Sequence, residues 1–136
     1  MASVPVTLKV ADFKDREVAN VTYSFEQAVD KENQPAGIPR GGKIEIRVKA
    51  MNDGNPELLK WMLNKTLAKK GEIIFMNSSD ADKKMKSIQF ETAYCINYTE
   101  HWEDVQGGGT DLAHYEEISI VCKKITVEGV TFENGW

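Results

Sequence analysis

A two-residue alternation of apolar and polar side chains runs through most of this sequence and limits its possible folds. In residues 43–49, Ile44, Ile46 and Val48 alternate with charged residues. Because successive side chains of a strand point to opposite faces of a sheet, this pattern predicts a strand with one buried and one charged face. Similar rows are formed by Val4, Val6, Leu8 and Val10, by Ala19, Val21, Tyr23, Phe25 and Val29, by Ile88, Phe90 and Thr92, by Tyr94, Ile96 and Tyr98, by Ile118, Ile120 and Cys122, and by Ile125, Val127, Val130 and Phe132. With an apolar run at residues 72–76, about seven or eight strands are predicted, which indicates an antiparallel barrel or sandwich.

One helix interrupts the strand pattern, and we predict it over about Pro56 to Lys69. Asn55 is a favoured N-cap residue, and Pro56 fits the first helical position. Lysines near the end and Gly71 beyond it are typical of a helix C-terminus.

The apolar stripe of this predicted helix is wider than docking onto one sheet requires. It consists of Leu58, Leu59, Met62, Leu63 and Thr66, with Trp61 at its edge. Two interpretations of Trp61 stay open: it shields the stripe inside its own domain, or it meets a neighbouring subunit. Trp61 is therefore a possible subunit-interface residue.

The composition is that of a soluble globular protein with a single domain, residues 1–136. Apolar residues make up 41% and charged residues 28% of the chain, and no stretch reaches the ~18 apolar residues of a membrane span. The net charge of −4 opposes a phosphate-binding surface, so we expect no nucleic-acid partner and no membrane insertion. Residues 1–10 lack the basic start and apolar run of a secretory signal, so we expect synthesis in the cytoplasm. Cys95 and Cys122 have neither a CxxC spacing nor a secretory context, and we interpret both as free thiols.

The residues offer little for catalysis. His101 and His114 are the only histidines of the sequence, so any histidine-based acid, base or metal role falls on them. Carboxylates flank His101, but adjacent strand residues point to opposite faces and would not converge. The glycine run at residues 107–110 and the aspartates Asp80 and Asp82 lack the spacing of phosphate-binding and calcium loops. We predict no catalytic residue, no metal site and no cofactor.

Several segments of the sequence form a recognisable series. They are Tyr23-Ser24-Phe25, Asp30, Pro35, the pair Gly41-Gly42, the strand Lys43 to Val48, the helix Leu58-Leu59-Lys60-Trp61-Met62-Leu63-Asn64, the segment Met85-Lys86-Ser87-Ile88-Gln89-Phe90-Glu91, the strand start Ala93-Tyr94-Cys95 and the ending Val130-Thr131-Phe132-Glu133-Asn134-Gly135-Trp136. In this order they resemble the Hcp (TssD) family in the branch found in Bacteroidota. None of these motifs carries chemistry, so the similarity rests on their collinear order over nearly the whole chain.

The resemblance implies a mostly β fold, a small two-sheet antiparallel β-barrel with one flanking helix. It also implies a structural role: six copies close into a ring, and rings stack into the hollow inner tube of a type VI secretion apparatus. The implied partners are other copies of the chain, the contractile sheath, the tip and effectors that the tube carries or chaperones. The apparatus would export the protein from the cell.

The resemblance also gives a role to the long connection at residues 30–42. Its length and its prolines and glycines are unusual between two good strands, and such connections are usually functional or disordered. We expect it to reach an adjacent subunit or ring. The predicted contact residues are Asp30, Lys31, Glu32, Asn33, Gln34, Pro35, Ala36, Gly37, Ile38, Pro39 and Arg40.

Two alternatives to the tube subunit stay open at this point. The first is a monomeric β-sandwich that binds a peptide or small ligand with the loops at residues 30–42 and 105–114. The second is an enzyme centred on His101 or His114.

Overall fold

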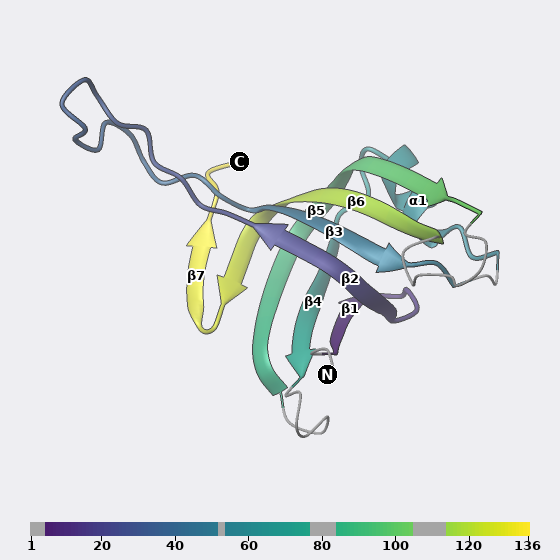
Figure 1. Cartoon of the computed structure of the whole chain (residues 1–136). Helices are drawn as coiled ribbons and strands as arrows, with labels where there is room; N and C mark the ends of the chain where they lie inside the picture. Colours follow the sequence, from purple (N-terminus) through teal and green to yellow (C-terminus); the bar gives the residue numbers. More distant parts are fainter. Residues whose placement is uncertain (1–4, 52–53, 77–83, 105–113) are drawn as a thin grey trace.

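The computed structural model describes residues 5–51, 54–76, 84–104 and 114–136, and Figure 1 shows the arrangement of the strands and the helix. Within these ranges the chain forms seven strands and one helix. The elements are β1 (Val6–Val10), β2 (Arg16–Tyr23), β3 (Lys43–Lys49), α1 (Glu57–Leu63), β4 (Lys69–Met76), β5 (Lys84–Trp102), β6 (His114–Val127) and β7 (Val130–Glu133).

The strands pair in antiparallel fashion, and six of those described close into a barrel. The sheet order is β3-β2-β1-β4-β5-β6-β7, and β3 also pairs with β6, which closes the ring of strands. In that closing pair, Ile44 lies opposite Ile120 and Ile46 lies opposite Ile118. β7 continues beside β6, with Phe132 opposite Ile125. The prediction of a mostly β antiparallel barrel with one flanking helix is confirmed.

The inward rows of the alternating segments fill the barrel. The buried apolar residues are Leu8, Val10, Val18, Ile44, Ile46, Val48, Leu58, Trp61, Ile73, Ile88, Phe90, Ala93, Cys95, Ile118, Ile120, Cys122 and Ile125. Fully burying a Val, Leu, Ile or Phe side chain stabilises a fold by about 1.5–3 kcal/mol relative to leaving it exposed. The single cluster that these residues form therefore accounts for most of the hydrophobic stabilisation of the domain.

β5 changes the face that it buries at Thr92, where the sequence pattern predicted unbroken alternation. Phe90 is buried, but the next buried side chain is that of Ala93. Thr92 has a positive φ of 51°, and the register between β4 and β5 shifts at the same level. An extra residue on one strand turns the following side chains to the opposite face.

A second irregularity follows on the other edge of β5. Its register with β6 shifts between Cys95 and Asn97. Cys95 is buried, Ile96 is exposed, and Tyr98 packs against the core. The prediction that Tyr94, Ile96 and Tyr98 share one face of a strand was wrong because of this shift.

α1 is shorter than predicted, since it ends at Leu63 and Lys69 begins β4. The predicted start of the helix is displaced by one residue: Pro56 is the N-cap residue of α1 and not its first helical residue. Asn55, which precedes it, still accepts through Oδ1 a hydrogen bond of 3.1 Å from the backbone N–H of Glu57. At the other end, Asn64 Oδ1 accepts hydrogen bonds from the backbone N–H (3.2 Å) and the hydroxyl (2.9 Å) of Thr66. This local turn replaces the next turn of helix. In the part of the chain that the structure describes, no helix has the length and hydropathy needed to span a bilayer.

A buried ion pair connects four strands of the barrel. Arg16 on β2 donates from Nη2 to Glu116 Oε1 on β6 (2.5 Å) and to the backbone oxygen of Lys49 on β3 (2.9 Å). The hydroxyl of Tyr98 on β5 donates to Glu116 Oε2 (2.6 Å). Burial, and then the contact with the Glu116 carboxylate, raise the pKa of Tyr98 well above its ordinary value. Removing one partner would leave a buried charge uncompensated, so loss of either Arg16 or Glu116 alone should destabilise the fold.

Candidate functional site

Residues 24–42, between β2 and β3, leave the barrel as a long projection that we call the arm (Figure 1). Glu26 and Arg40 exchange two backbone hydrogen bonds of 2.9 and 2.7 Å. Further out, the N–H of Ala36 donates to the oxygen of Ala28 (2.8 Å). Isolated bridges thus pair the two halves of the arm and give it a defined shape.

A tight turn closes the far end of the arm. Asp30 Oδ1 accepts hydrogen bonds from the backbone N–H groups of Glu32 (2.9 Å) and Gln34 (3.0 Å). Asn33 adopts a left-handed φ of 63°, which asparagine tolerates better than most residues. The loop predicted to lack regular structure is therefore a paired arm with an aspartate-stabilised turn.

The arm presents large apolar side chains to solvent. Phe25 is 43% exposed, Val29 58% and Ile38 78%. Exposed apolar side chains on a projecting element make the arm a candidate contact surface.

The predicted contact residues from Asp30 to Arg40 all lie in the arm and are all exposed. The structure brings them together on one projection, although whether they touch another subunit stays a prediction. Phe25 and Val29 were not among the predicted contact residues, because the sequence pattern assigned them to one face of a longer strand. The polar Gln27, which breaks the apolar row between them, is the signal that the strand ends earlier.

Trp61, the other predicted interface residue, lies inside the domain and is 1% exposed. Its Nε1 donates to the backbone oxygen of Leu67 (3.0 Å), and its ring meets that of Phe13 edge-on with centroids 5.9 Å apart. Of the two interpretations, the structure supports the one in which Trp61 shields the core of its own domain. On α1, Leu59 and Leu63 have the exposed apolar surface instead.

The two histidines do not form a joint site. His101 stacks on Tyr115 at 5.0 Å, whereas His114 Nε2 lies 2.9 Å from Glu100 Oε2. His114 is opposite Trp102 in the β5–β6 pair, one residue along from the pair of His101 and Tyr115, so the two rings point to opposite faces. Among the residues described, no group of three or more His, Cys, Asp or Glu side chains could hold a metal ion. The segments at 77–83 and 105–113, which include Asp80, Asp82 and the glycine run, lie outside the described residues.

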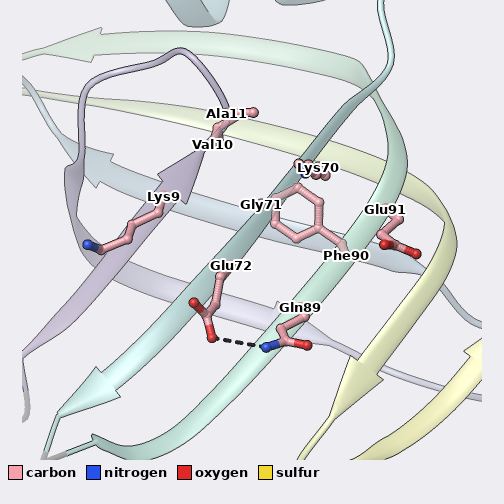
Figure 2. A pocket seen from close by; sticks show the side chains of 9 residues that line it. All are labelled: Lys9, Val10, Ala11, Lys70, Gly71, Glu72, Gln89, Phe90 and Glu91. Carbon is pink, nitrogen blue, oxygen red and sulfur yellow. Dashed lines mark hydrogen bonds between the residues drawn. The ribbon is translucent and has the colours of Figure 1, made fainter.

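A hollow of about 400 Å³ lies over β1, β4 and β5, and Figure 2 shows the residues that line it. Lys9 and Glu72 line it on either side, and the Phe90 ring lies beside Gly71. Glu72 Oε2 accepts a hydrogen bond of 3.3 Å from Gln89 Nε2. The ion-pair partners of these two charged groups lie outside the lining, since Lys9 pairs with Asp15 (3.4 Å) and Glu72 pairs with Lys84 (3.2 Å).

Comparisons with known proteins extend over the whole chain. The family model for hemolysin coregulated protein Hcp (TssD) matches residues 2–136. No curated protein is similar enough to match. Among solved structures, Hcp1 from Flavobacterium johnsoniae is 32% identical, with a TM-score of 0.82, and the alignment covers 96% of this chain and 99% of that chain.

Two more distant structures share the fold. A mutant of Hcp1 from E. coli EAEC 042 has a TM-score of 0.73 at 12% identity, with 98% of this chain and 100% of that chain covered. The sheath-tube complex of an extracellular contractile injection system, PVC, contains a chain with a TM-score of 0.59 at 17% identity, with 92% of this chain and 88% of that chain covered.

The family match along nearly the full sequence and the similarity to a Bacteroidota Hcp1 confirm the resemblance found in the collinear motifs. The chain therefore belongs to the hemolysin coregulated protein Hcp (TssD) family and has the role of a tube subunit of a type VI secretion system.

Proposed function

We propose that six copies of this chain close into a ring, that rings stack into a hollow tube, and that the arm makes the contacts between rings or neighbouring subunits. The observation that carries this proposal is the exposed apolar surface of the arm, formed by Phe25, Val29 and Ile38. Apolar side chains exposed together on one element are typical of an interaction surface.

The shape of the subunit agrees with a ring. A head-to-tail ring needs two different surfaces on each copy, and it closes when the rotation between copies divides a full turn. The arm projects from one end of the barrel, so it meets a surface of the next copy other than its own root (Figure 1). A rigid barrel with a paired arm is suited to this repeated geometry.

The finer parts of the function follow from the family. The subunit would be made in the bacterial cytoplasm and exported by the apparatus, with a contractile sheath around the tube, a tip at its end and effectors carried in its lumen. The sheath-tube complex with the same fold supports the association with a sheath. The subunit acts by assembly and not as an enzyme, since the family is structural and the histidines of this chain face apart.

The test is to shorten the arm. Because Glu26 and Arg40 are paired, a short Gly/Ser turn can replace residues 27–39 without moving the barrel. Loop-closure entropy changes slowly with length, so the free energy of unfolding should change by about 1 kcal/mol or less. Electron microscopy should show that stacks of rings are lost. A cooperative unfolding transition should show that the domain stays folded.

Two further variants separate the apolar surface from the backbone of the arm. Val29→Ser/Ile38→Ser keeps the arm and should weaken stacking. Val130→Ser removes an apolar side chain that is 74% exposed on the β6–β7 hairpin and should leave stacking unchanged. If tubes of the shortened chain form as readily as those of the parent, the arm is a solvated excursion and the proposal is wrong. If the shortened domain does not fold, the arm belongs to the internal packing instead.

A further inference from the structure

The root of the arm lies next to Cys122, inside β6, and next to Asn134, the residue that follows β7. The backbone N–H of Cys122 donates to the oxygen of Gly42 (2.7 Å), which ties the returning half of the arm to β6. The N–H of Asn134 donates to the oxygen of Lys123 (2.7 Å), which ties the end of β7 to the same part of β6. Three segments distant in the sequence therefore meet at the point where the arm leaves the barrel.

The side chain of Asn134 joins two of these segments. Its Nδ2 donates to the backbone oxygen of Gly41 (3.1 Å) in the arm and to that of Cys122 (2.9 Å) on β6. A primary amide has two N–H donors, and these two hydrogen bonds use both of them. An aspartate of the same shape would place a carboxylate against two carbonyl oxygens.

Close packing at the root leaves no room for a side chain on Gly41 or Gly42. Gly42 has a φ of 91°, and a Cβ on it would lie 2.7 Å from the oxygen of Cys122 and 2.8 Å from Asn134 Nδ2. A Cβ on Gly41 would lie 2.2 Å from the Phe25 ring. That ring in turn meets Phe132 of β7 edge-on at 5.5 Å. β7 thus holds the arm by an aromatic contact as well as by the amide.

We infer that Asn134 is a positioning residue for assembly: its amide sets the direction in which the arm leaves the barrel and thereby places the arm for its contact with another copy. Proper folding of the barrel does not depend on this amide, since the core rows lie on the inner face of the strands. The inference rests on the proposed function of the arm, and it adds that a residue directly after β7 positions the arm for that function.

Hydrogen exchange measured by mass spectrometry on the full chain tests this inference. Asn134→Asp should accelerate exchange in residues 24–42 by about tenfold or more, because two hydrogen bonds at the root are lost. Exchange in β3, which is buried in the barrel, should stay as in the parent. The matched control is Asn97→Asp, which makes the same change on an exposed position of β5. Parent and variants are compared at a concentration where light scattering gives them the same mass.

The outcomes separate this inference from the proposed function. Unchanged exchange in the arm overturns the inference, and so does acceleration in β3 equal to that in the arm, since Asn134 would then support the whole fold. Should Asn134→Asp fail to fold, Asn134→Ala removes both donors without adding a charge and is judged by the same two readouts. If the arm loosens and stacks of rings still form as in the parent, the positioning role stands and the assembly role of the arm fails.

Discussion

The environment of Trp61 determines what its removal costs. The ring is buried with Phe13, and its Nε1 satisfies the backbone oxygen of Leu67. Trp61→Ala should lower the free energy of unfolding by about 3–5 kcal/mol, as large aromatic truncations in cores do. Chemical denaturation measures this loss. Leu63→Ala on the same helix is the control, because Leu63 is exposed and surface changes usually stay within about 0.5 kcal/mol.

Assembly provides the opposing outcome for Trp61. If Trp61→Ala weakens the hexameric ring while the unfolding midpoint of the variant equals that of the parent, the Trp61 side chain makes a subunit contact. Its assignment to the core of its own domain would then be wrong.

Burial of Cys95 and Cys122 makes the stability of the barrel depend on pH. Both thiols are buried, and neither forms a disulfide. Burial raises the pKa of Cys95 from its ordinary 9.0 to about 11 and that of Cys122 to about 12. Above about pH 9 the unfolded chain therefore loses thiol protons that the folded chain keeps. The contribution of the two buried thiols to the free energy of unfolding is complete below about pH 9. It is lost as the pH rises towards the pKa values of the folded state, by up to about 1.4 kcal/mol per pH unit for each thiol.

A variant without thiols isolates this effect. Cys95→Ala/Cys122→Val should show a smaller alkaline decrease in the free energy of unfolding than the parent, measured by denaturant titration between about pH 8 and about pH 11. Its ring mass should equal that of the parent, because Cys122 acts as a small apolar side chain. Equal pH dependence in the two proteins, or loss of the ring with the domain still folded, would contradict this account.

Among the elements, β4 packs closely against β1 and the Phe90 ring because Gly71 has no side chain. A Cβ at this position would lie 2.5 Å from the backbone oxygen of Lys9 on β1 and 2.6 Å from Phe90 Cζ, whose ring covers the glycine (Figure 2). Gly71→Ala must displace β1 or the Phe90 ring, so the free energy of unfolding should fall by about 1–3 kcal/mol. Gly135→Ala is the control, since nothing lies within 4 Å of its Cβ position. Identical denaturation midpoints for the two variants would show that β1 or the Phe90 ring moves aside without loss of stability, which would contradict the prediction.

Elements built from short-range periodicity could be predicted from the sequence. In β3 the three apolar residues Ile44, Ile46 and Val48 all face the core, as their spacing indicates. The end of α1 could not be predicted from lysines and Gly71, because the Asn64 side chain stabilises a turn before them. Helix propensity is weak compared with such local competition.

Contacts between distant residues explain the other differences. The change of face at Thr92 depends on how β5 meets β4 around the barrel, and no local pattern signals a positive φ at a threonine. The arm was predicted in its position and its exposure, but its root was not. The bond from Asn134 to Gly41 spans 93 positions of the sequence, so no local pattern could reveal it.

In the whole molecule, the closed barrel provides the stable fold and the arm provides the surface proposed for assembly. β3 pairs with β6 to complete the barrel, so the domain folds around one core. The arm lies outside this core and carries apolar residues that the fold does not use. The central claim is therefore that the chain is built to assemble with copies of itself.

Light scattering on the eluate of a size-exclusion column tests this claim most directly. The parent chain should elute with a mass of about 92 kDa, six times the 15.3 kDa of one chain, or with multiples of that mass where rings stack. A mass of 15.3 kDa at every concentration would contradict the assembly and favour a monomeric binding module.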